Sequence, residues 1–406
     1  MKRIIGFAVL VSSIIATMPT PGSADEPVLR FSGDLRGRWE TFRFSEDETG
    51  SKKDRRARIR YRLRLDMRAR LNTRAAVKIR LGTGDTDTRS GNQTIGSPVD
   101  FGPNEIDVRR AYLVFTPFEN GKLPNRDGHW AFQFGKVANP FVWKHSKDVL
   151  LWDHDINPGG ISTTFDLAFA DGASVLYVNA AGFVISETSS GSKDPYMAVA
   201  QVALKQNLGS RFKAGIRGTW YNLGDLDSLF IVRGAVGKAG DSTAVTTGGG
   251  NIPDGLTGDV NGGSMNVIET TLYVTMPGTW PVTVFGGYST NLDAQASQLT
   301  TAGEDNVGYN IGAEVGDEKK NVLVGGGYYY LEANAFPSQF IDSDVLDGFT
   351  NRKGFLAYLS RQIMSRTTFA LTFLHSDAIE TTLPDYGPSV KDSERFRTQV
   401  DLVYAF

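Results

Sequence analysis

The chain has no cysteine, only four histidines, and no apolar run beyond its first residues that could cross a membrane as a helix. The absence of cysteine excludes disulfide scaffolds, thiol nucleophiles and Cys-ligated metal sites. With 43 Lys and Arg against 45 Asp and Glu, the chain also lacks the charge excess that attracts proteins to nucleic acid. If the chain spans a membrane, this composition leaves only a closed β-barrel, because only helices and barrels satisfy every backbone hydrogen bond in lipid.

The first 24 residues have the parts of a secretory signal peptide. Two basic residues precede an apolar stretch over 4–15, and Gly22 and Ala24 stand at the −3 and −1 positions of a cleavage site. An uncleaved anchor is the alternative, but the stretch is shorter than the ~20 residues of a spanning helix. We therefore expect residues 1–24 to be removed, leaving 41 basic and 45 acidic residues and a net charge of −4 in residues 25–406.

Apolar and polar residues alternate along most of the remaining chain, which is the pattern of β-strands. From Arg56 to Leu71, arginines and one aspartate alternate with apolar residues. A helix would scatter these arginines around its axis, whereas a strand places them on one face. About sixteen segments show the alternation: 28–42, 55–71, 75–84, 105–117, 129–137, 161–169, 173–186, 195–206, 210–222, 264–276, 281–291, 306–316, 321–332, 352–363, 366–376 and 394–406.

The connections between these segments are alternately long and short. The long ones are 43–54, 85–104, 138–160, 187–194, 223–263, 292–305, 333–351 and 377–393. Membrane barrels have long loops outside and short turns on the periplasmic side. The sequence therefore predicts an all-β fold: a transmembrane antiparallel up-and-down β-barrel of about 16 strands, with long extracellular loops and short periplasmic turns.

The arginines of segment 55–71 decide which face points inward. An arginine in contact with lipid costs roughly 2–4 kcal/mol near the bilayer midplane, and a protein is stable by only about 5–15 kcal/mol. We therefore expect these arginines to face a hydrated lumen, where water screens neighbours spaced ~6.7 Å apart. The expected pore-lining residues are Arg36, Arg38, Arg58, Arg60, Arg62, Arg64, Arg68, Lys78 and Arg80.

The third long connection, 138–160, is expected to fold into the lumen as a constriction loop. Its charged residues include Lys144, Asp148, Asp153 and Asp155. An acidic loop opposite a basic wall would create a transverse field that orients dipolar solutes and holds back apolar ones. The alternative is that the loop lies on the outer rim and its acidic side chains are merely solvated.

The chain resembles two kinds of bacterial outer-membrane porin, the general and the phosphate-selective porins. The resemblance rests on the strand number, the long third connection, the basic wall and a final strand that alternates up to Phe406. Shorter stretches, Arg109 to Leu113, Gly135-Lys136 and Asn139 to Phe141, are similar to the phosphate-selective type and to related putative porins. The resemblance implies a homotrimer in the outer membrane, in contact with its lipid and lipopolysaccharide. It also makes Phe406 the signal read by the barrel assembly machinery.

Two stretches of the sequence point weakly to other kinds of chemistry. His145 and His154 share a loop with Asp153 and Asp155, as a hydrolytic dyad would require, but no nucleophile motif lies nearby. Asp153, Asp155 and Asn157 faintly resemble a calcium loop, without the glycine and glutamate that such a loop needs. We expect no enzyme activity, no cofactor and no metal.

Three functions remain open. The leading one is a water-filled channel for passive diffusion of small polar solutes and ions. The second is a specific channel for anions, guided by the basic wall. The third is an adhesin or scaffold whose barrel only displays the long surface loop 223–263.

Overall fold

The computed structural model describes residues 28–44, 56–84, 88–96, 104–141, 150–187, 194–226, 263–294, 303–379 and 394–406. The strands in these residues are Val28–Phe44 (β1), Arg56–Arg70 (β2), Ala75–Gly82 (β3), Gln93–Thr94 (β4), Asp107–Phe115 (β5), Gly128–Lys136 (β6), Gly159–Phe169 (β7), Ser174–Val184 (β8), Tyr196–Leu208 (β9), Phe212–Gly224 (β10), Met265–Met276 (β11), Val282–Asn291 (β12), Val307–Gly316 (β13), Leu323–Leu331 (β14), Arg352–Met364 (β15), Thr367–Ala378 (β16) and Arg395–Ala405 (β17). Short 3-10 helices lie in the connections: Glu119–Gly121 (η1), Ser338–Phe340 (η3) and Leu346–Gly348 (η4). No helix within the described ranges has the length and apolar character needed to cross a membrane.

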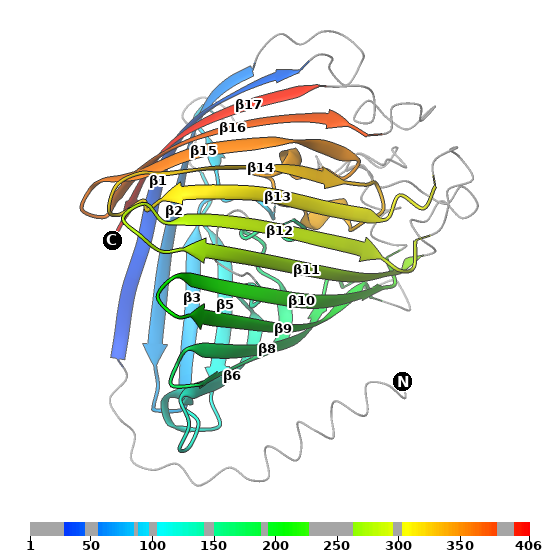
Figure 1. Cartoon of the computed structure of the whole chain (residues 1–406). Coiled ribbons are helices and arrows are strands. Elements are labelled where there is room, and N and C mark those ends of the chain that lie inside the picture. The colour runs from blue at the N-terminus through cyan, green and yellow to red at the C-terminus, as the bar shows by residue number, and fades with distance from the viewer. Residues whose placement is uncertain are drawn as a thin grey trace.

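The strands of the described residues form one antiparallel sheet that closes on itself (Figure 1). Consecutive long strands pair with each other, and β17 returns to pair with β1 from Asp34↔Ala405 to Phe44↔Arg395. β4 has two residues and pairs with β2 beyond the end of β3. The wall that these residues build thus has sixteen long strands, and the predicted barrel of about sixteen strands is confirmed.

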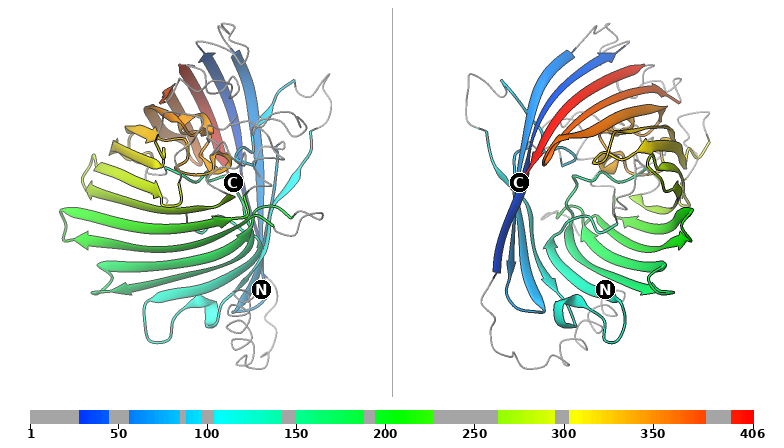
Figure 2. Two further views of the ribbon diagram at one scale, coloured as in Figure 1. Left: turned by 90° about the vertical axis from the view of Figure 1, so that its right-hand side faces the viewer. Right: turned by 60° about the vertical axis from the view of Figure 1, so that its left-hand side comes forward.

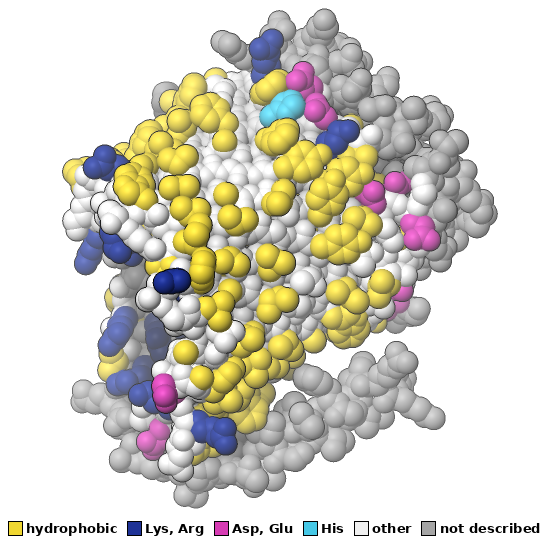
Figure 3. Space-filling view, in the orientation of Figure 1, with side chains coloured by type: hydrophobic (Ala, Val, Ile, Leu, Met, Phe, Trp, Pro, Cys, Tyr) yellow, Lys and Arg dark blue, Asp and Glu magenta, His cyan; other side chains and the backbone are white. Residues whose placement is uncertain are grey.

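Alternation along each strand separates an outer apolar face from an inner polar one. On β2 the side chain of Ile59 is 56% exposed and that of Arg60 only 7%. Apolar side chains cover much of the outer surface in Figure 3. Because successive side chains of a strand point to opposite faces, the arginines of β2 lie inside the ring, as their energetic cost in lipid requires.

The connections differ in length between the two ends of the barrel, as the sequence predicts (Figure 2). Short turns join β7 to β8, β9 to β10 and β15 to β16. Gly209 in one of them has a φ of 68°, a left-handed conformation that glycine adopts without steric cost. The predicted signal peptide and almost all of the predicted surface loop 223–263 lie outside the described residues.

The interior of the ring contains a hydrophobic cluster. It is built by the connection between β6 and β7, the connection between β14 and β15, and the inner faces of β8 to β11, β14 and β15. Trp152 of the first connection stacks on Phe340 of the second, with ring centroids 6.0 Å apart. The described parts of both connections are therefore packed inside the barrel.

Candidate functional site

Arginines on the inner faces of three adjacent strands form what we call the basic wall. Its members are Arg36 and Arg38 of β1, Arg58, Arg60, Arg62 and Arg64 of β2, and Arg397 of β17. Strand register places Arg36 opposite Arg62 and Arg38 opposite Arg60. Facing residues on neighbouring strands have Cβ atoms only about 4.5–5.5 Å apart, so these guanidinium groups need countercharges.

The first countercharge is Glu40 of β1, whose side chain is fully buried. Its carboxylate accepts hydrogen bonds from Arg60 at 3.3 Å and from Arg397 at 3.0 Å, and it also contacts Arg58. One carboxylate thus joins arginines of two strands that are both neighbours of β1. Charged hydrogen bonds of this kind are the stronger ones in proteins.

Asp34 of β1 and Asp401 of β17 supply two more countercharges. Asp34 accepts hydrogen bonds from Arg62 at 3.1 Å and Arg64 at 2.7 Å, while both oxygens of Asp401 bind Arg38 at 2.7 and 2.8 Å. We expected water to screen the arginines, but carboxylates do so in the structure. With seven arginines and three strand carboxylates, the basic wall keeps four excess positive charges.

The third long connection reaches the basic wall through Asp155. Its two carboxylate oxygens lie 3.4 Å from Arg62 and 3.3 Å from Arg64. Lys144 and Asp148, the other charged residues predicted in the constriction loop, lie outside the described residues. The contact shows that this part of the connection lies inside the ring and against β2.

The connection between β14 and β15, residues 332–351, also reaches the basic wall, which sequence reasoning missed. Asp344 lies 3.1 Å from Arg38 and 3.4 Å from Arg397, and it accepts a hydrogen bond from Gln399 at 2.9 Å. The one hint in the sequence is the spacing of three aspartates in this connection: Asp342, Asp344 and Asp347. A second acidic segment therefore contacts the same arginines.

The two inner connections are bonded to each other. Asp153 accepts a hydrogen bond from the amide of Ser343 at 2.8 Å, and its own amide donates to the carbonyl of Phe340 at 2.8 Å. His154 Nδ1 lies 3.2 Å from Asp342. Burial, with the carboxylate of Asp342 nearby, raises the pKa of Asp153 well above its ordinary value.

These contacts bear on the two other chemistries considered from the sequence. Asp153 faces backbone amides and Asp155 faces arginines, while the Asn157 side chain accepts a hydrogen bond from Arg110. Their oxygens do not converge on one point, as calcium ligands must. His154 pairs with an aspartate of another connection, and His145 lies outside the described residues.

A pocket beside the third connection is lined mainly by arginines: Arg62, Arg64, Arg80 and Arg109, together with Thr83, Gly91, Asp155 and Asn157. Arg80 is held by two hydrogen bonds to Asp66, at 2.7 and 2.6 Å. Arg109 donates to the carbonyls of Thr83 and Ser90. These contacts hold the guanidinium groups in fixed orientations and keep several positive charges close together at this part of the interior.

The remaining predicted residues lie farther along the strands. Lys78 Nζ lies 5.7 Å from the ring centre of Tyr112, and Arg68 is exposed toward the end with the short turns. Phe406 is 43% exposed on the outer side and its backbone exchanges two hydrogen bonds with Gly33, at 2.9 and 3.0 Å. The chain end is thus joined to β1 at the closure of the barrel.

A closed sixteen-strand barrel with an apolar outer face, a charged interior and connections that fold inward in their described parts is the fold of the porin-type barrels. The family described as "Putative porin" matches residues 49–228, a little under half of the chain. No curated protein matches the chain in sequence. The resemblance to bacterial outer-membrane porins is confirmed.

Solved porins share the fold. OprB of Pseudomonas putida, in its high-pH structure, is 10% identical with a TM-score of 0.54, covering 93% of this chain and 94% of that one. OmpF of Salmonella typhi, in complex with daunomycin, is 10% identical with a TM-score of 0.50, covering 93% of this chain and 97% of that one. At this identity the likeness concerns the fold alone.

Proposed function

We propose that this protein is a porin that forms a water-filled channel for passive diffusion of small polar solutes and ions. The observation that carries the proposal is the charged interior, in which acidic connections inside the ring meet the basic wall. Such an arrangement favours polar solutes, because charges of opposite sign across a narrow passage orient dipoles and disfavour apolar molecules. No catalytic role is part of the proposal.

The channel is narrowed by two connections. The third connection, 138–160, acts as the predicted constriction loop, supported by the contacts of Asp155 with β2. The connection 332–351 narrows the interior from another side through Asp344. In this proposal the predicted pore-lining arginines act partly as anchors for the acidic connections and partly as contacts for solutes.

Selectivity for anions is a second candidate function, and the arginine-lined pocket favours it. Four arginines face that pocket and only one carboxylate lines it. An anionic solute there would gain charged hydrogen bonds that a neutral solute does not make. The pocket supports a preference for anions without identifying the anion.

The proposed export, assembly and location of the protein follow from the sequence predictions. Residues 1–24 serve as a signal peptide, Phe406 as the signal for the barrel assembly machinery, and the mature chain assembles as a homotrimer among outer-membrane lipid and lipopolysaccharide. The adhesin alternative depends on the loop 223–263, nearly all of which lies outside the described residues. It receives no support from the charged interior.

Planar-bilayer recordings of the purified full-length protein test the proposal. Large ohmic conductance steps are expected for a diffusion channel, and small saturable steps for an anion-specific one. The reversal potential in a salt gradient then gives the ion preference. A protein that inserts into the bilayer without any conductance would overturn the channel proposal and favour the adhesin or scaffold.

A further inference from the structure

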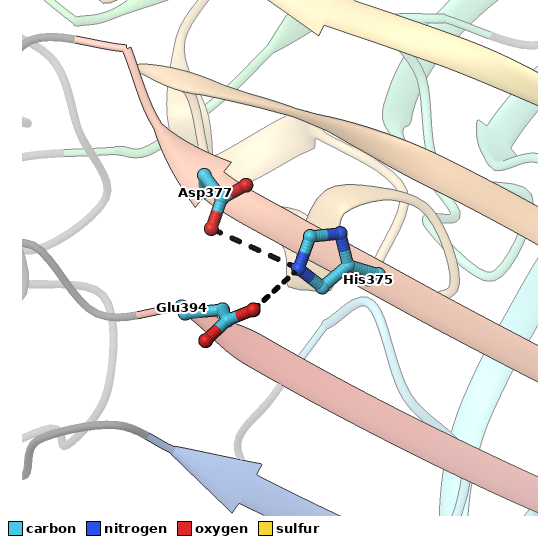
Figure 4. A group of neighbouring side chains, drawn as sticks. All are labelled: His375, Asp377 and Glu394. Carbon is cyan, nitrogen blue, oxygen red and sulfur yellow. Dashed lines mark hydrogen bonds and ion pairs between the residues drawn. The ribbon is translucent and has the colours of Figure 1, made fainter.

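Three side chains converge on the outer surface of the barrel, at the end that carries the long connections. His375 and Asp377 stand two residues apart on β16, and Glu394 directly precedes β17 on the neighbouring strand (Figure 4). Leu374 and Ser376, the two sequence neighbours of His375, are buried, so His375 and Asp377 face outward. This cluster is separate from the basic wall and from the inner connections.

The three potential ligand atoms are close enough to share one ion. His375 Nε2 lies 3.1 Å from a Glu394 carboxylate oxygen and 3.8 Å from an Asp377 carboxylate oxygen, and all three atoms lie within 4.8 Å of one another. If the Asp377 and Glu394 oxygens are 4.8 Å apart, a point equally far from the three ligand atoms lies about 2.4 Å from each of them. Zinc–nitrogen and zinc–oxygen bonds are ~2.0–2.2 Å long. Small side-chain rotations would close the difference.

The sheet fixes the backbone positions of His375 and Asp377 on β16, and Glu394 directly precedes β17. His375 is directly opposite Phe396 in the β16–β17 register, and the two rings lie 4.5 Å apart between centroids. The imidazole is therefore supported on one side, and its Nε2 is directed at both carboxylates in Figure 4. A preorganised set loses less conformational entropy when it binds an ion.

The ligand set also indicates which ions it suits. An imidazole nitrogen with two carboxylates fits divalent transition metals such as zinc, whereas calcium and magnesium prefer oxygen ligands alone. The side chains of His375, Asp377 and Glu394 are 29%, 44% and 50% exposed, so water can occupy the remaining coordination position. Three protein ligands and one open position are a common zinc arrangement.

An ordinary histidine–carboxylate hydrogen bond is the competing explanation, and the chain contains examples of it. His129 lies 3.3 Å from Asp166, and His154 lies 3.2 Å from Asp342. Within the described ranges, only the cluster at His375 brings three potential ligands together. Lys353 stands opposite Asp377 in the β15–β16 register.

We propose that His375, Asp377 and Glu394 bind one divalent transition-metal ion, with zinc as the ion best suited to the site. A bound ion would join β16 to the start of β17 at the outer end of the long connection between them. The site does not depend on the proposed channel function, so either proposal can fail without the other.

Isothermal titration calorimetry of the metal-free full-length protein with zinc(II) in detergent micelles tests this proposal. The wild-type protein is expected to bind one zinc per chain, and excess calcium should not compete. His375→Ala and Glu394→Gln should each lower the affinity at least about tenfold. His129→Ala is the matched control, because it removes an exposed histidine that has a single carboxylate partner, and it should bind zinc as the wild type does.

Folding of each variant is checked by the heat-dependent mobility of the barrel on denaturing gels. Cobalt(II) absorption provides a second readout, since a visible spectrum of the bound ion should be present in the wild type and His129→Ala and lost in His375→Ala. Absence of zinc binding by the wild type, unchanged binding by folded His375→Ala, or equal loss in His129→Ala would each overturn the proposal.

Discussion

Replacing Asp344 by asparagine should weaken the attachment of the connection 332–351 to the basic wall, where Ser343 and Asp347 also contact Arg397. Asp344 contacts Arg38 at 3.1 Å, Arg397 at 3.4 Å and Gln399 at 2.9 Å. Both arginines keep strand partners when this carboxylate is neutralised, since Arg38 still binds Asp401 and Arg397 still binds Glu40. The change therefore acts on the link between connection and wall and leaves the barrel folded.

The size of the effect follows from these contacts. A charge pair at about 3–3.5 Å represents about 5 kcal/mol of Coulomb energy at an effective dielectric constant of about 20, before desolvation is subtracted. Measured net values for hydrogen bonds to charged groups are about 1.5–3 kcal/mol. We take about 2 kcal/mol for the contacts of Asp344 alone, because its side chain is 27% exposed and because asparagine retains an acceptor oxygen. That value raises the population with a released connection roughly 30-fold.

Single-channel recording in planar bilayers measures the outcome. The Asp344→Asn variant should show more frequent excursions to higher conductance, and its reversal potential should shift toward anions because one negative charge has left the interior. Asp171→Asn is the control: it removes an aspartate from the exposed β7–β8 turn, where asparagine tolerates the φ of 54°. Conductance and reversal potential equal to wild type in Asp344→Asn would refute the reasoning.

Three further predictions concern the interior. Replacing three arginines of β2 by glutamate, at positions Arg60, Arg62 and Arg64, should move the reversal potential toward cations. An unchanged reversal potential would show that these arginines do not line the permeation path. Asp401→Ala should destabilise the barrel by about 1.5–3 kcal/mol, because it removes the charged hydrogen bonds to the buried Arg38, which keeps Asp344 as a partner. Gels run after graded heating should show unfolding at lower temperature, and an unchanged temperature would contradict this. The raised pKa of Asp153 means that the folded state prefers its protonated form, so its contribution to stability is present at low pH and lost as pH rises through the raised pKa. The neighbouring Trp152 should then show a pH-dependent fluorescence change that is absent in Asp153→Asn, and identical profiles in both proteins would argue against the assignment.

The alternating strands were predictable because burial on one face imposes a period of two on the sequence. The segment from Arg56 to Leu71 shows this most clearly, and its arginines lie on the inner face as expected. The segments 173–186 and 321–332 gave a weaker signal, since they are apolar or glycine-rich on both faces. The structure supplies the reason: Phe183 and Tyr329 point inward to the hydrophobic cluster around the inner connections.

The contacts of the inner connections could not be predicted from the sequence. Asp344 and Arg38 are 306 residues apart in the chain, and nothing in the local pattern of either residue indicates the other. The same holds for Glu40 and Arg397, which meet only because the barrel closes between β1 and β17. Sequence periodicity identifies the faces of strands, whereas ring closure and loop packing determine which charges become neighbours.

The hydrophobic cluster inside the ring distributes apolar and charged side chains unevenly around the interior. Apolar packing holds the two connections against one arc of strands, while their carboxylates extend to the arginines on another arc. In the proposed channel, the open route would therefore run beside these two connections, and its width would depend on their length and anchoring. Shortening one of them by a few residues would change which molecules fit without altering a single strand.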